Sequence, residues 1–286
     1  YTVSAELSGS SMVSSVGGGD VGDVGERLLS AVSGDDFDVG LLDSVVEAVH
    51  KQYGAEQKKA NAILTALKAS ESAWLKVDAI LARSRSDRTR YFALQVLEDA
   101  VQKRWKSLPR EQCEAVKKYV TSLIIGLCVD EGAGDSRRLE LQKLNGVLVE
   151  IVKYEWPHRW PTFVSDLVRS SFTGEAICQN NMQILRLLSQ EVFDFAGMSL
   201  TSAKAQALRQ SMCTQFSEIF DLCVEVLCKC TNNALILTTL ETVLIFVSWI
   251  PHGYLFETNF TDILTSRFLS AAPFRNVCVK CMTEIA

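Results

Sequence analysis

Cysteine is the residue type in this sequence whose members lie close enough together along the chain to bind a metal ion. Cys223, Cys228 and Cys230 lie close together, and Cys278 and Cys281 form a Cys-x-x-Cys pair. Zinc normally takes four ligands, often from turns, whereas these cysteines fall inside continuous helical patterns, where Cys228 points away from Cys223. We therefore interpret these thiols as small apolar packing groups and predict no metal site.

Other motifs that could carry chemistry lack the partners that the chemistry needs. His158 lies between two Trp-Pro dipeptides in "EWPHRWPTF" with no second ligand nearby, so we interpret it as a residue of an interhelix turn. Gly17, Gly19 and Gly22 spell the dinucleotide motif G-x-G-x-x-G, but polar, Ser-rich chain precedes them instead of a strand. With three histidines and no Ser-His-Asp set or P-loop, we predict no catalytic residues, no enzymatic activity and no cofactor.

The composition is that of a globular protein with reduced thiols. The nine cysteines are an odd number, which argues against a secreted disulfide framework and favours the cytosol or nucleus. Residues 51–110, the most basic segment, carry thirteen Lys/Arg against six Asp/Glu, which is too few for a nucleic-acid footprint. The most apolar window, 235–250, contains Glu241 and is short for a membrane span. We predict no direct contact with nucleic acid or membrane.

The elements that carry these residues are predicted to be helices. From Leu41 onward the apolar residues recur with a helical period, with polar loops at 83–89 and 130–136, and no segment alternates as a strand does. The fold class is therefore all-α. Residues 1–34 are rich in Gly and Ser and are expected to form a flexible arm, while 35–286 form the folded part.

The helices repeat in pairs along the chain. A shift of 51 residues aligns Leu97 with Leu148, Ala100 with Ile151, Val101 with Val152 and Trp105 with Trp156. Pro109 and Pro157 soon follow the two tryptophans, and a third copy ends at Trp249 and Pro251. Helix pairs of roughly 40–50 residues predict an α-solenoid of HEAT-like repeats, the ARM/HEAT superhelix. Trp105 and Trp156 are expected to be buried, and each proline to end one helix or begin the next.

Several segments carry a family resemblance in addition to this pattern. They are "EWPHRWPTF", "CQNNM" (178–182), "EVFDF" (191–195), "WIPHGYLFET" (249–258) and "FRNVCVKCMTEIA" (274–286). They resemble the N-terminal part of the exportin-one family, the receptors for leucine-rich nuclear export signals within the importin-β (karyopherin) superfamily. Residues 41–110 resemble the superfamily's N-terminal Ran-binding region, and 111–286 resemble exportin repeats. The Gly/Ser arm and the loops "RSRSDRTR" and "DEGAGDSRR" depart from the family pattern.

The resemblance implies a carrier that shuttles between nucleus and cytoplasm through nuclear pores. Such a carrier binds Ran-GTP together with a leucine-rich export-signal cargo, and it contacts phenylalanine-glycine nucleoporins. Ran lies against the second helices of the N-terminal repeats, whereas the cargo groove belongs to repeats beyond Ala286. Because the chain opens at Tyr1 and stops inside a helical pattern, we expect a piece of a longer protein with part of the Ran surface and no cargo groove.

The candidate Ran-binding residues are the polar residues opposite the apolar stripe of each second helix. They are Lys58, Asn61, Thr65 and Lys68 in the first repeat, Tyr91, Gln95, Glu98 and Gln102 in the second, and Gln142, Asn145 and Lys153 in the third. For each of them, an ordinary solvated position is the alternative interpretation.

Two further questions stay open at the level of sequence. The arginine run at Arg83, Arg85, Arg88 and Arg90 fits a solvated loop, a surface for an acidic partner, or phosphorylation at Ser84 and Ser86, which would reduce the local positive charge. An import receptor of the importin-β type, or a static HEAT scaffold such as a phosphatase regulatory subunit, is the alternative function. A scaffold would bind its partners regardless of the nucleotide on Ran.

Overall fold

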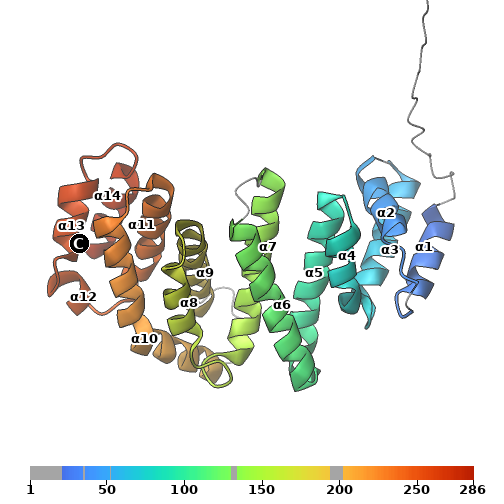
Figure 1. The fold of residues 1–286 in the computed structure, drawn as a ribbon, viewed down its shortest axis with the longest axis horizontal. Coiled ribbons are helices and arrows are strands. Elements are labelled where there is room, and N and C mark those ends of the chain that lie inside the picture. The colour runs from blue at the N-terminus through green and yellow to red at the C-terminus, as the bar shows by residue number, and fades with distance from the viewer. Residues whose placement is uncertain (1–20, 35, 52, 130–133, 194–201) are drawn as a thin grey trace, which may run out of the picture. The chain divides into compact units, whose positions relative to one another are not determined.

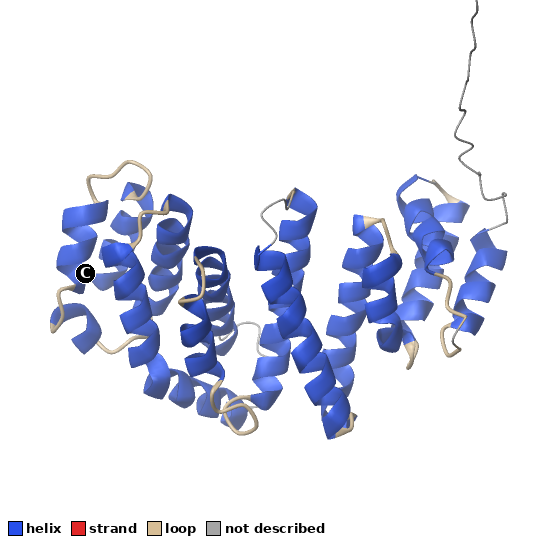
Figure 2. Ribbon diagram, viewed as in Figure 1, coloured by secondary structure: helices blue, strands red, loops and turns tan. Residues whose placement is uncertain are grey.

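The computed structural model describes residues 21–34, 36–51, 53–129, 134–193 and 202–286. Within these ranges the chain consists of helices joined by turns and loops, and no strand is present (Figure 1, Figure 2). The described chain divides into two compact units, Tyr1–Thr89 and Arg90–Ala286. The prediction of an all-α fold is confirmed.

The first unit is built from short helices that pack on one another. They are α1 (Val21–Ala31), α2 (Val39–Lys51), α3 (Ala55–Ala69), the 3-10 helix η1 (Ala73–Lys76), α4 (Val77–Arg83) and the first turn of α5 (Asp87–Arg104). Asp38 begins α2, because its Oδ1 accepts hydrogen bonds from the backbone N–H groups of Gly40 at 2.8 Å and Leu41 at 3.4 Å. Gly54, with a φ of 71°, separates α2 from α3 in a conformation that favours glycine.

The flexible arm predicted over residues 1–34 is wrong for its second half. Residues 21–31 form α1, which packs against α2 and α3 and buries Leu28 completely. Gly25 is also buried, and a Cβ placed there would lie 2.3 Å from Ile63 Cδ1 of α3. The glycine that made the segment resemble a linker therefore allows a close approach of two helices. Residues 1–20 lie outside the described part of the chain.

The second unit repeats a helix pair along the chain. Its elements are the rest of α5, the 3-10 helix η2 (Trp105–Ser107), α6 (Arg110–Val129), α7 (Asp135–Glu155), α8 (Phe163–Ser171), α9 (Glu175–Phe193), α10 (Ser202–Lys229), α11 (Asn233–Val247), α12 (Gly253–Phe256), α13 (Phe260–Ile263), the π-helix η3 (Leu264–Phe268) and α14 (Arg275–Ile285). Within the pairs α6 packs on α7, α8 on α9 and α10 on α11. The second helices α7, α9, α11 and α14 pack on one another in succession. This neighbour-to-neighbour packing is that of HEAT-like repeats, as predicted.

The two Trp-Pro dipeptides mark the end of a helix, as the sequence predicted. α7 ends at Glu155, a turn follows, and α8 begins at Phe163 after its N-cap residue Thr162. His158 is exposed in this turn. The eight residues aligned by the 51-residue shift are all buried, including Trp105 at 2% and Trp156 at 1% exposure. The subdivision of the chain at 110/111 stays a prediction.

Most side chains of the apolar window 235–250 lie in the core. No described helix is long and apolar enough to cross a membrane. Glu241, at the centre of α11, pairs with Arg186 of α9 at 2.6 Å.

Cys223, Cys278 and Cys281 are buried among apolar side chains, and burial raises the pKa of Cys281 to about 12. These three thiols therefore act as packing groups, whereas Cys230 is half-buried and Cys228 is exposed, so the packing interpretation is wrong for Cys228.

The packing of α1 can be tested by removing one side chain. Leu28→Ala is expected to lower the free energy of unfolding of the first unit by about 2–5 kcal/mol, because it leaves a cavity between helices. Glu26→Ala, at an exposed position of the same helix, is the matched control. Amide exchange of α1 and thermal melting are the measurements. If α1 exchanged like an unfolded peptide and Leu28→Ala melted normally, the flexible-arm prediction would be correct after all.

The two buried tryptophans give a second test. Trp105→Ala and Trp156→Ala are each expected to destabilise the second unit by about 3–5 kcal/mol, as for other core aromatics. Trp105 Nε1 donates to Glu155 Oε1 at 2.9 Å, whereas Trp156 Nε1 has no acceptor among the described residues. Trp105→Phe should therefore cost about 1–3 kcal/mol more than Trp156→Phe, since it removes one hydrogen-bond donor from the buried carboxylate of Glu155. Urea unfolding followed by circular dichroism measures both, and equal costs would mean that the Trp105–Glu155 bond adds no net stability.

Candidate functional site

The predicted second-helix residues fall into two groups that lie in different units. Lys58, Asn61, Thr65 and Lys68 lie on α3 in the first unit, where the first three are exposed. In the second unit, Tyr91, Gln102 and Gln142 are exposed, and Gln95 and Glu98 are half-buried. We call the set Tyr91, Gln95, Glu98, Gln102 and Gln142 the α5–α7 face. These side chains can reach a partner without unfolding any part of the described chain.

Ion pairs join α5 and α7 beneath and beside this face. Arg90 of α5 contacts Glu140 of α7 at 2.6 Å, and Glu98 of α5 is hydrogen-bonded to Lys143 of α7. The ammonium of Lys143 also lies 5.9 Å from the centre of the Tyr91 ring. Glu98 and Tyr91 are therefore held in place by a residue of the next repeat, so they present a preformed arrangement to a partner.

Two of the predicted surface residues are buried, and the expectation that they are exposed is wrong. Asn145 is completely buried and exchanges two hydrogen bonds with Asn180 of α9, at 2.7 Å and 3.1 Å. Lys153 is 3% exposed and donates to Glu150 at 2.6 Å and to Glu191 of α9 at 2.9 Å. Burial by itself lowers the pKa of Lys153, but the bonds to the two carboxylates outweigh it and raise that pKa above its ordinary value. Both residues join α7 to α9.

Glu155 is the most heavily bonded carboxylate at the end of α7. It is 1% exposed and accepts hydrogen bonds from Trp105 Nε1 and from Arg110 at the start of α6, while Arg159 lies 3.6 Å away. Burial raises the pKa of Glu155, but the bond from Arg110, the bond from Trp105 and the two guanidinium charges outweigh it and hold the pKa below its ordinary value. The carboxylate therefore remains ionised while buried.

Tyr154, the neighbour of Glu155, lies beside two lysines from other elements. Its hydroxyl donates to the Gln102 carbonyl at 3.0 Å, which connects it to the α5–α7 face. The ammonium of Lys204 near the start of α10 lies 4.5 Å from the Tyr154 ring centre, and that of Lys106 in η2 lies 5.7 Å from it. Burial lowers the pKa of Lys204, and the charge of Lys106 lowers it further.

The arginine run is not a solvated loop over its whole length. Only residues 84–86 lie between α4 and α5, and Arg90 is paired within the second unit as described above. Ser84 is buried and donates to Asp43 Oδ1 at 2.6 Å, so its proposed phosphorylation does not fit this structure. Ser86 Oγ accepts a hydrogen bond from the Thr89 N–H at 3.3 Å, at the first turn of α5. Phosphorylation of Ser86 stays a prediction.

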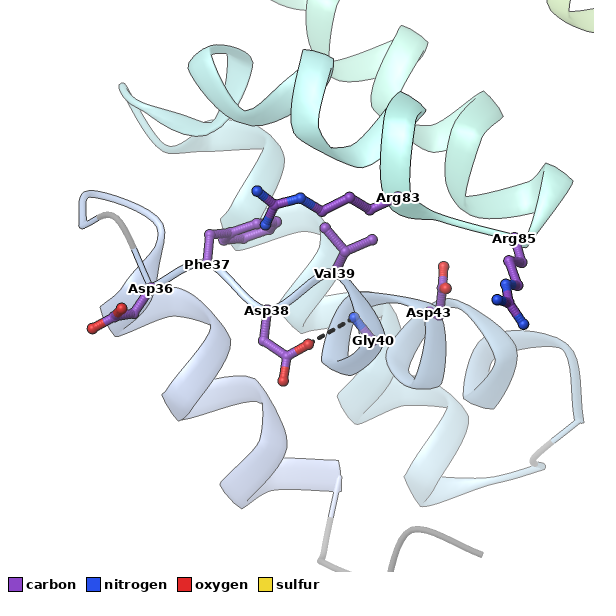
Figure 3. A pocket seen from close by; sticks show the side chains of 8 residues that line it. All are labelled: Asp36, Phe37, Asp38, Val39, Gly40, Asp43, Arg83 and Arg85. Carbon is purple, nitrogen blue, oxygen red and sulfur yellow. Dashed lines mark hydrogen bonds between the residues drawn. The ribbon is translucent and has the colours of Figure 1, made fainter. Parts of the chain in front are cut away.

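A hollow of about 570 Å³ lies beside this loop in the first unit (Figure 3). Arg83 and Arg85 line one side of it, and Figure 3 shows the Arg83 side chain extending over Phe37. Asp38 and Asp43 also line the hollow, but Asp38 begins α2 and Asp43 accepts the Ser84 hydroxyl, so both carboxylates already serve the fold. An acidic partner at the two arginines stays a prediction.

Sequence reasoning missed the residues that hold the face together. Lys143, Arg90, Glu140 and Glu155 lie beside or between the apolar positions, where a helical pattern gives no sign of a partner in the next repeat. One signal was present: Glu140 and Glu155 follow Arg90 and Trp105 by 50 residues, close to the repeat length. Buried carboxylates at the repeat spacing could have been paired with donors in the preceding repeat.

Comparison with known proteins agrees with the resemblance described above. A family model described as "Exportin 1-like protein" matches residues 138–282, and one described as "Importin-beta N-terminal domain" matches residues 60–125. The first match runs from the start of α7 to α14, and the second from α3 to α6.

Individual relatives match most of this chain but only part of their own length. Exportin-1 of Drosophila melanogaster is 50% identical over 250 residues, which is 87% of this chain and 24% of that protein. Exportin-1 of Schizosaccharomyces pombe is 43% identical over 251 residues, 88% of this chain and 23% of that protein. Exportin-5 of Homo sapiens is 28% identical over 149 residues, 50% of this chain and 12% of that protein. The chain thus spans about a quarter of the length of the Exportin-1 relatives.

The lowered pKa of Glu155 predicts a pH dependence of stability. A carboxyl whose pKa in the folded state lies below its ordinary value of 4.5 stabilises the fold at pH values above 4.5. This stabilisation is lost as the pH falls through the folded-state pKa. Glu155→Gln should therefore lower the free energy of unfolding by about 2–3 kcal/mol at pH 7, less than for a fully buried pair because Arg110 is 44% exposed. The difference from the parent should shrink as the pH falls below 4.5.

Urea unfolding at several pH values between 7 and 3.5 measures this difference, and Glu111→Gln, at an exposed position of α6, is the matched control. A difference that stayed constant over this range would show that the charge of Glu155 is not what stabilises the junction.

Proposed function

The chain belongs to the exportin 1-like family, and on that premise we propose that it is the N-terminal part of a nuclear export receptor that binds Ran-GTP. The name Exportin-1 describes the full-length relatives, and this chain spans about a quarter of their length. The activity of the whole receptor is therefore inferred from the relatives, and the part played by this chain from its own surface.

One observation carries the proposal for this chain. The stretch that matches the importin-β N-terminal domain, residues 60–125, includes most of the exposed second-helix candidates on α3 and α5. Within the second unit, Gln142 extends the α5–α7 face from α5 onto the next repeat. A partner that binds there would touch Tyr91 and Glu98, which Lys143 already orients, so little side-chain entropy would be lost at these two residues.

The proposed contacts are divided between direct and supporting residues. Lys58, Asn61, Thr65 and Lys68 on α3, and the five residues of the α5–α7 face, contact Ran directly. Asn145 and Lys153 do not; they hold α7 against α9 and so determine the angle between adjacent repeats. Small changes in such angles add up along a solenoid, because each repeat contacts only its neighbours.

The physical basis of transport in this proposal is linkage between two ligands. Ran-GTP and an export-signal cargo each favour the same curvature of the full-length receptor, so each increases the affinity of the other. Hydrolysis of GTP disorders the switch loops of Ran and lowers the affinity of the receptor for both Ran and the cargo. The cargo groove, the contacts with phenylalanine-glycine nucleoporins and the shuttling between nucleus and cytoplasm belong to the full-length receptor.

The nucleotide dependence of Ran binding tests this function. The full-length receptor should bind Ran loaded with GTP much more tightly than Ran loaded with GDP, and an export-signal peptide should increase the affinity further. A triple variant of Gln95, Gln102 and Gln142 to Ala should weaken Ran-GTP binding at least about tenfold, since each of the three lost hydrogen bonds contributes roughly 0.5–1.5 kcal/mol. Isothermal titration calorimetry measures each affinity.

The matched control replaces three exposed glutamines of first helices, Gln112, Gln206 and Gln210, by Ala. It should leave both the affinity and the melting temperature unchanged. Equal binding of the two nucleotide forms would favour a static scaffold over an export receptor. Nucleotide-dependent binding that was insensitive to the triple variant would keep the export function and reject this face.

A further inference from the structure

Lys106 and Lys204 are two cations that share one aromatic ring. They come from different elements, η2 and the start of α10, and both approach Tyr154 near the end of α7. We call these three residues the Tyr154 cluster. Attraction between an ammonium and the face of an aromatic ring explains why each lysine lies there, but the two positive charges also repel each other.

No carboxylate among the described residues pairs with either lysine. The other positive charges near Lys204 are already balanced, because Lys153 bonds to two glutamates and Arg159 lies 3.6 Å from Glu155. Glu155 is 1% exposed and is occupied by its own donors, so it is closed to a further partner. The Tyr154 cluster therefore carries two positive charges with no carboxylate in contact, and Glu155 acts on Lys204 only through space, too weakly to offset burial and the charge of Lys106.

The position of the ring in this cluster is set by the fold. The Tyr154 hydroxyl donates to the backbone carbonyl of Gln102, which holds the ring between η2 and α10. Lys204 is half-buried and has lost part of its hydration, so an anion at this place would compensate a charge that the chain leaves unbalanced. A site that is preorganised and positively charged before its ligand arrives binds that ligand with little rearrangement.

From this geometry we infer that the Tyr154 cluster binds an acidic segment of a partner protein, with one carboxylate at Lys106 and a second at Lys204. The inference goes beyond the proposed function and does not depend on the identity of Ran as a partner. It assigns a binding role to residues outside the α5–α7 face and outside the set of Ran-binding candidates.

The spacing of the two lysines favours two carboxylates of one segment. Because the ammonium nitrogens lie 4.5 Å and 5.7 Å from the same ring centre, they are at most about 10 Å apart. Alternate side chains of an extended segment, and side chains one helical turn apart, are separated by roughly 6–7 Å. Lysine also presents a point charge without the planar fork that arginine offers to phosphate. The net charge of −5 for the whole chain opposes a nucleic-acid ligand.

Binding of a defined acidic probe to the complete 286-residue chain tests the inference. The probe is a fluorescein-labelled hexaglutamate peptide, and hexaglutamine of the same length is its neutral counterpart. Fluorescence anisotropy at low salt should show binding of hexaglutamate alone, and the affinity should fall as salt is added, because the contact is between partly exposed charges. Lys106→Gln and Lys204→Gln should each weaken binding about fivefold, the upper range for a single partly exposed ion pair.

Two further variants distinguish the cluster from general surface charge. Lys118→Gln combined with Lys280→Gln removes two positive charges, twice the change in either single variant, from exposed positions elsewhere in the second unit and should leave the affinity unchanged. Tyr154→Phe keeps the ring between the two lysines but loses the bond to Gln102, so it should weaken binding less than Tyr154→Leu, which removes the ring. The pKa of Lys204, followed by nuclear magnetic resonance of its side chain, should rise when hexaglutamate binds.

Several results would overturn the inference. Equal loss of affinity in the Lys118/Lys280 control would show that the peptide responds only to net charge. Competition by millimolar inorganic phosphate as effective as that by the peptide would show a phosphate site instead. Tighter binding of a single-stranded oligonucleotide than of hexaglutamate would indicate nucleic acid.

Discussion

A single buried carboxylate, Glu155, connects the end of one repeat with the beginning of the next. A charge with 1% exposure is tolerated only when it is surrounded by donors, and Glu155 has Trp105 from η2, Arg110 from α6 and Arg159 from the turn that follows α7. Four segments must therefore be in place at once. The position of the α7–α8 turn, and with it the direction in which the next repeat begins, depends on this arrangement.

The same logic continues along the second helices of the second unit. Polar side chains that face the neighbouring repeat are paired across the α5–α7, α7–α9 and α9–α11 junctions: Arg90 with Glu140, Asn145 with Asn180, Lys153 with Glu191, and Arg186 with Glu241. These bonds are directional, whereas the apolar contacts between the same helices are not. They therefore select one register between repeats, which packing of aliphatic side chains alone would leave free to slide.

This pairing also separates the residues that are available to a partner from those that are not. Polar side chains at a repeat junction are bonded to the neighbouring helix. The polar side chains of the α5–α7 face lie on the exposed side of α5 and α7 and remain available to a partner. Gln102 connects both roles, since its side chain is exposed while its carbonyl accepts the Tyr154 hydroxyl. A ligand on the α5–α7 face and one at the Tyr154 cluster would therefore bind to adjoining parts of one rigid set of helices.

The sequence by itself determined the helical class, the repeat and the family. The 3.6-residue period of the apolar positions, the 51-residue shift that aligns Trp105 with Trp156, and the prolines after them are local features that survive in any environment. Tertiary structure decided which polar residues remain free. Asn145 and Gln142 lie on the same polar side of one predicted helix, yet only Gln142 is exposed, because α9 covers Asn145 and supplies Asn180 as its partner. Likewise, Gly25 is typical of a linker in the sequence, whereas in the structure Ile63 of α3 lies so close to it that no side chain fits there. Burial depends on which helix lies opposite, and that information is spread over residues 35 or more positions away in the chain.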